Sequence, residues 1–414
     1  MSNQSSPSQN ISPSSRATLP RSLRSPVPKE PRVQREVNAL GLLNLAGGAR
    51  KHLLAAKDAL SLLPCLVLTL FAVACGGGSS SSTSNLLYVA DSGSSQISIF
   101  KIGSDSTLAA TSFSPLSVGS APFVIAIRPD KKFAYAIRSA SNDIQIYSVN
   151  ASTGALSSSA TVASSGTGPT TLAIDPSGKF LYVGNSSTTN ISAYTIDATA
   201  GGLTSVGSPY AIQAAASELV ITPSSKYLYA SASDRGVIYA YQIDSSTGAL
   251  SRIPGSPFSA GIGPTGLAIT PSEAYLYASD NFSNRVYAFS IQSGSGILFT
   301  VVGSPFTAGS NPAGMAIDST SKYVYVANQN SSSLSAFTID SQGALSQISG
   351  SPYTTGSVPV FVAISPSTGA VYVANHGANN ISEFSVTTST GQLTALTGSP
   401  VATGSAPVWM TATK

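Results

Sequence analysis

The stretch Pro176-Ser-Gly-Lys-Phe-Leu-Tyr-Val-Gly-Asn185 is the fullest copy of a phrase that occurs seven times between residues 85 and 414. Its tyrosine recurs every 47 or 48 residues, and an aromatic residue follows each copy twelve positions later. The tyrosines are Tyr88, Tyr135, Tyr182, Tyr229, Tyr277, Tyr325 and Tyr372, and the second set is Phe100, Tyr147, Tyr194, Tyr241, Phe289, Phe337 and Phe384. Two markers with one period indicate seven copies of a structural unit, and a period in the forties is typical of propeller blades.

Each unit is predicted to form four short antiparallel strands. In the copy from Gly168 to Pro209, turn residues separate four strand-like stretches, at 169–176, 179–185, 190–197 and 202–209. Pro-Ser-Gly precedes the second stretch, and in several copies Gly-Ala-Leu opens the fourth and Gly-Ser-Pro closes it, where a proline suits an outer edge strand. The sequence therefore predicts an all-β, seven-bladed β-propeller of four-stranded blades over residues 85–414.

The two ends of the repeat region are complementary. The region opens at Leu86-Leu-Tyr-Val-Ala-Asp91, which is a second strand without a first strand before it. The chain stops at Pro407-Val-Trp-Met-Thr-Ala-Thr-Lys414, which is a first strand with nothing after it. We therefore expect the C-terminal strand to join the N-terminal blade, which closes the ring and removes its free edges.

The residues before the repeat region differ in composition. Residues 1–49 begin with a long Ser-, Pro- and Arg-rich stretch that lacks apolar periodicity, and we expect disorder there. Signal peptides rarely carry so many residues ahead of their charged segment. We therefore also expect translation of the natural protein to start nearer Arg50.

Residues 50–74 have the order of a secretory signal, with a basic flank and then an uncharged apolar run. The run ends Leu70-Phe-Ala-Val-Ala-Cys75-Gly-Gly-Gly, which resembles the processing site of bacterial lipoproteins. That resemblance implies that Cys75 becomes the first residue and carries lipid, and that residues 75–84 form a Gly/Ser tether. It implies an exported protein, anchored by lipid at the bacterial cell envelope, periplasmic or surface-exposed. The alternatives are an ordinary signal peptide cut after Ala74 and an uncleaved N-terminal anchor.

The distribution of charge excludes one class of partner. The chain has a net charge of +4, but residues 1–74 hold nine basic and three acidic residues, or +6. From Cys75 onward 12 basic residues face 14 acidic ones, or −2, so the folded part has no basic excess for nucleic acid. The only cysteines are Cys65 and Cys75, and the mature domain would hold a single histidine. We therefore expect no disulfide, no metal, no cofactor and contact with a membrane through the lipid anchor only.

A candidate site follows from the predicted inner strands. Counted from the Pro position of each blade, the third and fifth residues are apolar, so alternation predicts that the second, fourth and sixth residues line the central channel. The fourth is Ala in five blades, which indicates a narrow channel, and the sixth forms a polar ring from Arg128, Asp175, Thr222, Thr270, Asp318, Ser365 and Thr413. The second residues are Val124, Thr171, Glu218, Gly266, Gly314, Phe361 and Trp409, so Glu218 is the one ionisable group predicted there.

Loops between second and third strands open on the same face as these second residues. They carry Arg138, Asp143, Asp234, Arg235, Asp280, Arg285 and His376. Because Glu218, Arg235 and Arg285 come from neighbouring blades, the sequence predicts that they converge on an anionic or hydroxylated ligand, with Thr171, Phe361, Trp409 and His376 as further ligand contacts. The alternative is that the loop charges are merely solvated and that Glu218 is hydrated at a wet pore.

The repeat Pro-x-Gly-Lys-Phe-Leu-Tyr-Val-x-Asn, with its Gly-Ala-Leu and Gly-Ser-Pro turns, resembles the bacterial lactonase-type seven-bladed propellers. That group includes 6-phosphogluconolactonases and the surface propellers with Tyr-Val-Thr-Asn repeats. Its enzymes carry Gly-Pro-Arg-His at the start of an inner strand. The matching stretches here are Gly168-Pro-Thr-Thr171 and Gly263-Pro-Thr-Gly266, which lack both the Arg and the His. The resemblance therefore implies the fold more strongly than the catalysis.

Two functions remain open on the sequence. The first is a monomeric cell-envelope module that binds or scaffolds an envelope protein, a glycan, or a small lactone or sugar acid. The alternative is a lactone hydrolase in which Glu218 is the base and Arg235 or Arg285 stabilises the carbonyl oxygen.

Overall fold

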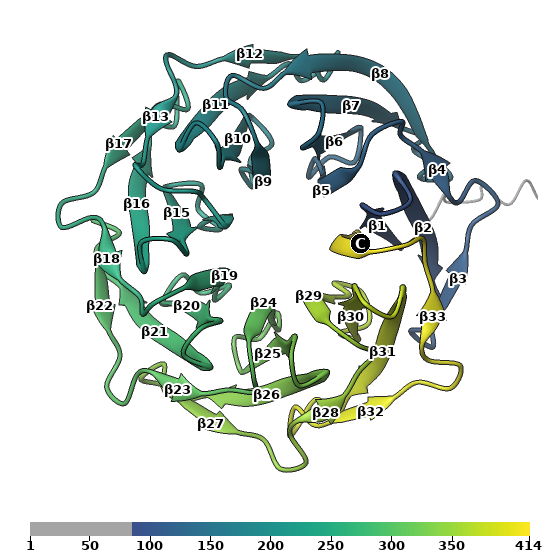
Figure 1. Cartoon of the computed structure of the whole chain (residues 1–414), viewed down its shortest axis with the longest axis vertical. Coiled ribbons are helices and arrows are strands. Elements are labelled where there is room, and N and C mark those ends of the chain that lie inside the picture. Colours follow the sequence, from purple (N-terminus) through teal and green to yellow (C-terminus); the bar gives the residue numbers. More distant parts are fainter. Residues whose placement is uncertain (1–84) are drawn as a thin grey trace, which may run out of the picture. The chain divides into compact units, whose positions relative to one another are not determined.

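The computed structural model describes residues 85–414, which form seven radial sheets around a central channel (Figure 1). These residues contain strands and turns, and among them no helix is long and apolar enough to cross a membrane. The predicted all-β, seven-bladed propeller is confirmed. The predictions for residues 1–84, including lipidation of Cys75, concern residues outside the described part.

We number the blades in chain order. In each blade the innermost strand borders the channel and the following strands lie successively further out (Figure 1). Blade 1 contains β34 (Pro407–Ala412), β1 (Leu86–Asp91), β2 (Gln96–Ile102), β3 (Leu108–Ala110) and β4 (Leu116–Ser117). Blade 2 contains β5 (Pro122–Ile127), β6 (Phe133–Arg138), β7 (Asp143–Val149) and β8 (Leu156–Ala163). Blade 3 contains β9 (Pro169–Ile174), β10 (Phe180–Asn185), β11 (Asn190–Ile196), β12 (Leu203–Ser205) and β13 (Tyr210–Ala211).

The remaining four blades repeat this plan. Blade 4 contains β14 (Glu218–Ile221), β15 (Tyr227–Ala232), β16 (Val237–Ile243), β17 (Leu250–Arg252) and β18 (Phe258–Ser259). Blade 5 contains β19 (Pro264–Ile269), β20 (Tyr275–Asp280), β21 (Arg285–Ile291), β22 (Leu298–Thr300) and β23 (Phe306–Thr307). Blade 6 contains β24 (Pro312–Ile317), β25 (Tyr323–Asn328), β26 (Ser333–Ile339), β27 (Leu345–Gln347) and β28 (Tyr353–Thr354). Blade 7 contains β29 (Pro359–Ile364), β30 (Val371–Asn375), β31 (Asn380–Val386), β32 (Leu393–Ala395) and β33 (Val401–Ala402).

The ring closes as the ends of the repeat region predicted. Strand β34 pairs antiparallel with β1, from Leu87 opposite Ala412 to Asp91 opposite Pro407. The C-terminal strand is therefore the inner strand of blade 1, and it covers the edge of β1 that would otherwise be free.

The repeated tyrosine holds each blade to the next. All seven rings are buried between sheets, and each hydroxyl donates a hydrogen bond of 2.7 to 3.0 Å to a backbone carbonyl in the turn between the third and fourth strands of the following blade. A buried hydroxyl without a partner would destabilise the fold, so the partner explains why this position is tyrosine rather than phenylalanine. The acceptors are Gly154, Gly201, Gly248, Gly296, Gly343, Gly391 and Ser106.

The fourth strand differs from the prediction. In six blades it is split into two short pieces, and only blade 2 has a continuous outer strand, β8. The Gly-Ser-Pro turn lies between the pieces instead of ending the strand. At this turn the hydroxyl of Ser256 accepts the N–H of Ala240 in β16 at 2.9 Å, and Ser304 does the same for Ala288 in β21. The serine replaces a carbonyl that the outer strand would otherwise supply to the ladder.

A β-bulge follows the proline in the inner strands. In blade 3, Asn185 pairs with Pro169 while Gly184 pairs with Thr171, so Thr170 is an extra residue. The register shifts at the equivalent point in blades 1, 2, 5, 6 and 7. A bulge of this kind turns a side chain away from regular alternation, which has direct consequences for the channel.

Candidate functional site

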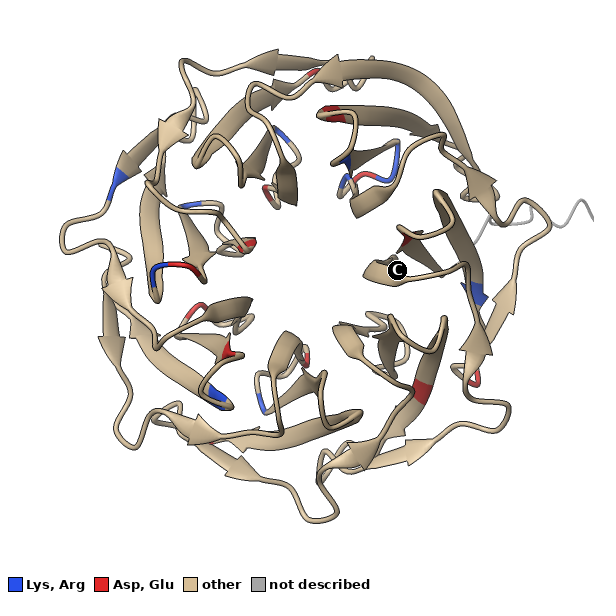
Figure 2. Ribbon diagram, in the orientation of Figure 1, with Lys and Arg blue, Asp and Glu red and all other residues tan. Residues whose placement is uncertain are grey.

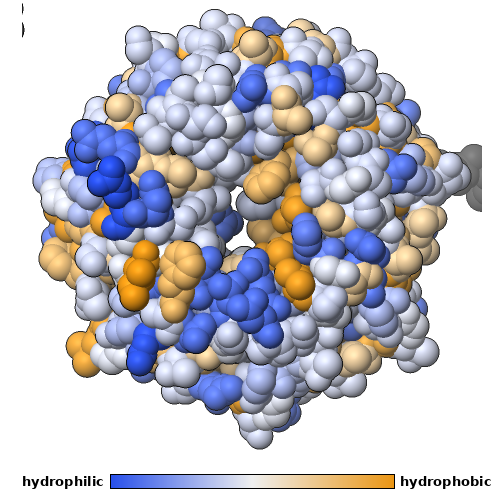
Figure 3. Space-filling model, viewed as in Figure 1, coloured by the Kyte–Doolittle hydropathy of each residue, from blue (hydrophilic) through white to orange (hydrophobic). Residues whose placement is uncertain are grey.

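A cavity of about 390 Å³ lies at one mouth of the channel, where the inner strands begin. We call this the upper face. All seven inner strands contribute to it, so the cavity lies on the axis of the ring. Figure 3 shows the channel opening on one face of the molecule, with apolar and hydrophilic side chains both gathered at its edge. The lining residues are Phe123, Thr170, Ser186, Ala215, Ala216, Ser217, Glu218, Thr265, Gly266, Ala313, Gly314, Gln329, Val360, Phe361, Val408 and Trp409.

The bulge determines which side chains face this cavity. Alternation predicted the second residue after each proline, but the first residues also line it, namely Phe123, Thr170, Ser217, Thr265, Ala313, Val360 and Val408. These seven were missed because Pro-x-x has the appearance of a regular strand in the sequence. The prediction that the second residues all line the channel is therefore corrected: Val124 and Thr171 are buried and absent from the cavity wall.

Thr171 packs between two blades. Its Oγ1 accepts the backbone N–H of Leu219 at 3.1 Å, and the side chain has no exposed surface. The third residue of the inner strand in blade 4 thus obtains a hydrogen-bond partner from blade 3. The Thr171 side chain therefore connects two blades, and its neighbour Thr170 borders the cavity instead.

Glu218 makes the same contact one blade further on. Its Oε2 accepts the backbone N–H of Leu267 in blade 5 at 2.7 Å, and the residue is 8% exposed. Burial raises the pKa of this carboxyl to about 8, although the Leu267 N–H opposes the shift. Within residues 85–414 no Lys, Arg or His forms an ion pair with it. At neutral pH Glu218 is therefore mainly a neutral carboxylic acid that can donate a hydrogen bond into the cavity.

Phe361 and Trp409 form an aromatic wall on the far side of the ring. They come from β29 and β34 in blades 7 and 1, and their ring centroids lie 4.0 Å apart with 35° between the planes. Both side chains are half-buried and border the cavity. The cavity therefore combines an aromatic surface on one side with a carboxyl on the other, and hydroxyl and carboxamide groups from Thr170, Ser186, Ser217, Thr265 and Gln329 lie between them.

The predicted basic partners do not line the cavity. Arg235 and Arg285 are exposed, and Arg285 begins β21 opposite Thr307 of the outer strand β23. His376 is half-buried in the loop after β30, where its backbone N–H donates to the carbonyl of Val358 at 2.9 Å. The structure thus does not bring these three side chains into the cavity with Glu218, and their part in a ligand site stays a prediction.

The sixth residues of the inner strands also differ from expectation. They lie at the opposite, lower end of the ring, and in blades 3 to 7 they cap the turns between first and second strands instead of forming an open polar ring. Arg128 in blade 2 instead donates to the carbonyls of Gly178 and Ala198 in blade 3. Asp175 is fully buried, and its Oδ1 accepts the N–H groups of Lys179 at 2.8 Å and Phe180 at 2.6 Å. Thr222 and Thr270 accept equivalent N–H groups in blades 4 and 5. The turn needs these acceptors, which explains the polar residue at this position.

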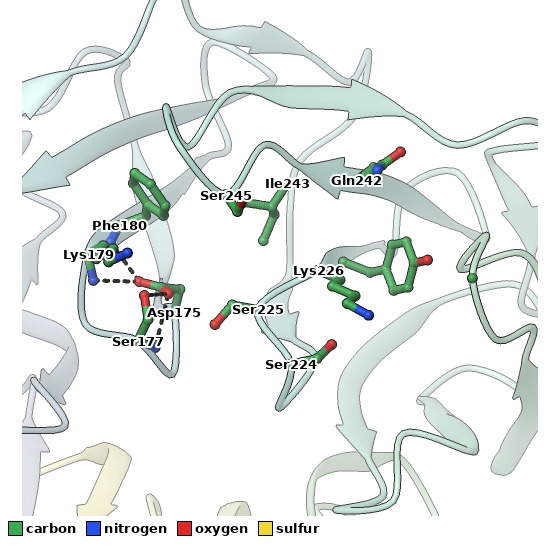
Figure 4. A pocket seen from close by; sticks show the side chains of 12 residues that line it. Asp175, Ser177, Lys179, Phe180, Ser224, Ser225, Lys226, Gln242, Ile243 and Ser245 are labelled. Atoms are coloured by element: carbon green, nitrogen blue, oxygen red, sulfur yellow. Dashed lines mark hydrogen bonds between the residues drawn. The ribbon is translucent and has the colours of Figure 1, made fainter.

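A hollow of about 520 Å³ lies on this lower face between blades 3 and 4 (Figure 4). Lys179, Lys226 and Asp175 border it, but the carboxylate of Asp175 is occupied by its own turn. Similar hollows recur between blades 1 and 2, 4 and 5, and 6 and 7, so they follow from the repeat. The axial cavity is not repeated, and it is the stronger candidate.

Neither the distribution of charged residues nor the placement of potential metal ligands indicates a second functional site within residues 85–414. Lys and Arg are interspersed with Asp and Glu around the ring (Figure 2). Within residues 85–414 no three His, Cys, Asp or Glu side chains gather in a way that could hold a metal ion.

The comparisons with known proteins agree with this architecture. The family model "Lactonase, 7-bladed beta-propeller" matches residues 119–216, 208–305 and 298–411, and the chain therefore belongs to this family. No curated protein matches the chain.

Three solved structures show the same fold. A proposed 6-phosphogluconolactonase from Bacteroides uniformis is 19% identical with a TM-score of 0.71, over 80% of this chain and 100% of that one. The periplasmic gluconolactonase PpgL of Pseudomonas aeruginosa is 18% identical with a TM-score of 0.70, over 80% and 99%. A protein from Lactobacillus plantarum is 18% identical with a TM-score of 0.67, over 80% and 99%. At these identities the likeness concerns the fold.

Proposed function

We propose that this propeller is a binding module of the cell envelope whose axial cavity takes a small, neutral, hydroxylated ligand. One observation carries the proposal: among the sixteen lining residues of the described cavity, Glu218 is the only ionisable one. A site of this kind recognises its ligand by shape, apolar contact and hydrogen bonds rather than by charge.

The chemistry of the wall fits a ring-shaped polyol or a lactone. Such molecules present apolar C–H faces, which pack against Phe361 and Trp409, and hydroxyl or carbonyl edges, which need hydrogen-bond partners. The protonated Glu218 donates to such an edge, and the lining hydroxyls of Thr170 and Ser217 both donate and accept.

Hydrolysis of a lactone is the second candidate, favoured by the family and by the gluconolactonase name of one structural neighbour. The reaction needs a base for water and a donor or cation for the carbonyl oxygen. Glu218 is mainly protonated below pH 8, and no lining residue of the described cavity is cationic. These properties favour binding over catalysis at neutral pH.

The proposed location is the outside of the cytoplasmic membrane, with the monomer attached through lipid at Cys75. The described residues are compatible with such an anchor. Strand β1 starts on the lower face and ends at Asp91, opposite Pro407 on the upper face. The chain therefore enters the propeller at the end away from the cavity, and a tether there would leave the upper face open to a neutral sugar, a lactone or a glycan.

The chain provides its own reporter for a binding test, because Trp409 is its only tryptophan. We propose titrating the purified propeller with neutral sugars, sugar lactones and sugar acids while recording tryptophan emission. We expect neutral sugars or lactones to change the emission saturably, and Glu218→Leu to weaken that response. A panel without any saturable change, checked by calorimetry, would reject the proposal.

A further inference from the structure

Blade 5 places two exposed apolar side chains beside the cavity. Ile262 is 67% exposed and Phe282 is 66% exposed, in the loops that flank β19 and β20 at the upper face. Single exposed apolar side chains are common on soluble proteins, but two on adjoining loops at the mouth of a cavity are placed to contact a ligand there. Their position next to a binding cavity gives them a candidate partner.

The ring of Phe282 lies directly against the chain segment that forms the cavity wall. A Cβ atom at Gly263 would overlap the Phe282 ring, so the ring covers the backbone of Gly263. Two residues further on, Thr265 lines the cavity. Because consecutive Cα atoms are about 3.8 Å apart, the Gly263 backbone that Phe282 covers lies no more than about 7 Å from Thr265, a span that one or two sugar rings can bridge.

One carboxylate fixes both loops. Asp280 is fully buried, and its oxygens accept the N–H groups of Ile262 at 2.8 Å, Gly263 at 3.0 Å and Phe282 at 3.1 Å. The loop backbone that carries the two exposed side chains is thereby held in place before any ligand arrives. Such pre-organisation reduces the entropy that is lost on binding.

The surface around Phe282 is polar but uncharged on the side of the cavity. The carboxamide of Asn311 donates to the carbonyl of Asn281 at 3.2 Å, and Gln329 lines the cavity beside it. Arg285 lies further out, opposite Thr307 of the outer strand. The exposed charges Asp234 and Arg235 lie on the other side of Ile262, in the blade 4 loop whose Gly236 packs against Gly261 and Ile262. A ligand that bridges the cavity and Phe282 therefore meets carboxamides, hydroxyls and apolar groups.

We propose that Ile262 and Phe282 form a second contact surface for the ligand of the axial cavity, and that this ligand is a neutral oligosaccharide. One sugar ring enters the cavity against Trp409 and Phe361, and the next rings pass over Phe282. This inference rests on the proposed binding function and names its ligand class. A sugar chain alternates apolar ring faces with hydroxyl edges, which matches separate apolar side chains set among carboxamides and hydroxyls.

A peptide fits this surface less well. Peptides commonly bind by adding a strand to a free sheet edge or by laying a helix into a continuous apolar groove. In blade 5 the strands β20 and β21 are paired on both sides, and the one unpaired edge, that of β19, faces the axial channel, which the other six inner strands surround. Ile262 and Phe282 are separated from the aromatic wall by polar lining residues.

The test is a length series of neutral oligosaccharides. Gluco-, manno-, xylo- and N-acetylglucosamine chains of one to six units are titrated against the full propeller, with Trp409 emission and calorimetry as readouts. We expect affinity to rise by about tenfold or more between one unit and three, in line with the gain from one aromatic contact. Phe282→Ala should remove this gain and leave the affinity for the single sugar unchanged. Phe299→Ala, which removes another exposed phenylalanine (53%) from the outer strand of the same blade, should change neither.

The outcomes separate the two proposals. Equal affinity for short and long chains, or a Phe282→Ala effect on the single sugar alone, overturns the second contact surface and leaves the cavity function standing. Absence of binding by any neutral sugar overturns the second surface. If neutral lactones also fail, the cavity function is overturned too, even if sugar acids bind. Binding of apolar peptides that depends on Phe282, without binding of sugars, replaces the oligosaccharide by a protein partner.

Discussion

The Oε2 atom of Glu218 in blade 4 accepts the backbone N–H of Leu267 in blade 5 at 2.7 Å. One carboxyl oxygen thus joins two blades, and the side chain also borders the axial cavity. This arrangement keeps the carboxyl buried and fixed, which raises its pKa to about 8 through desolvation. Structural and ligand-facing roles therefore meet in one residue.

Glu218→Gln should change how stability depends on pH. A carboxyl with a raised pKa stabilises the fold fully below its unfolded pKa of about 4.5 and loses that contribution as pH rises towards 8. Glutamine keeps an acceptor for Leu267 without this charge. We expect the variant to match the parent near pH 4.5 and to gain relative stability up to pH 8, on the order of a few kcal/mol.

Urea unfolding at pH 5, 7 and 9 measures this difference. Asp91 and Glu383 are also buried, and burial raises their pKa values as well, so the parent alone would not isolate Glu218. The difference between parent and variant does isolate it. A difference that stays constant across the three pH values would contradict the raised pKa.

Tyr372→Phe should weaken the closure of the ring. The Tyr372 hydroxyl donates to the Ser106 carbonyl at 2.7 Å, across the junction of blades 7 and 1. Removing the hydroxyl leaves this carbonyl without that partner, and we expect a loss of about 1–2 kcal/mol in the free energy of unfolding. Tyr353→Phe is the matched control, because its hydroxyl makes a 3.3 Å exposed bond and should change stability by less than about 0.5 kcal/mol. Equal effects of the two substitutions would show that the Tyr372 hydrogen bond contributes no more to stability than an exposed one.

Deletion of 407–414 should prevent the ring from closing. It removes β34, exposes the edge of β1 and takes away the inner strand of blade 1. We expect loss of cooperative thermal unfolding, or aggregation seen by size-exclusion chromatography. A truncated protein as stable as the parent would show that the closure contributes little.

Lactone hydrolysis separates binding from catalysis. We expect no turnover above background at pH 7 across a panel of γ- and δ-lactones. If the protein is a hydrolase, its rate should rise with pH up to about 8 as Glu218 ionises, and Glu218→Gln should lower it by about 10²- to 10⁴-fold. Robust turnover at pH 7 that disappears in Glu218→Gln would overturn the preference for binding.

Cys75→Ser tests the proposed anchor. If Cys75 is the lipidated first residue, the substitution should release the protein into soluble fractions or leave it unprocessed, as seen by fractionation and mass spectrometry. Native protein that still carries residues before Cys75 would contradict the anchor, and so would native protein with an unmodified Cys75.

The repeat made the fold predictable because each repeated residue has one structural task. Tyr182 and its six equivalents join blades through their hydroxyls, and Gly248 provides both the receiving carbonyl and a backbone with φ of 76°, which glycine adopts readily. Such tasks recur in every blade, so they appear in the sequence as a period. The outer strand was less predictable, because Gly-Ser-Pro interrupts it where the sequence suggested an end.

The site was predictable only in part, because its residues are those that differ from one repeat to the next. Glu218, Phe361 and Trp409 were found as exceptions at a repeated position, and all three border the cavity. Thr171 was predicted to line the cavity, but Thr170 lines it instead. The β-bulge that causes this depends on the hydrogen-bond register and not on residue type, so the sequence did not reveal it. Arg235 and Arg285 were grouped with Glu218 by blade order, which does not show how far outward a loop side chain lies.

A crystal structure soaked with a ligand that changes Trp409 emission tests the central claim most directly. We predict ligand density in the axial cavity, with a ring against Trp409 and Phe361 and a ligand oxygen within about 3 Å of the Glu218 carboxyl. Density in the lower hollow between Lys179 and Lys226, with an empty axial cavity, would contradict the account.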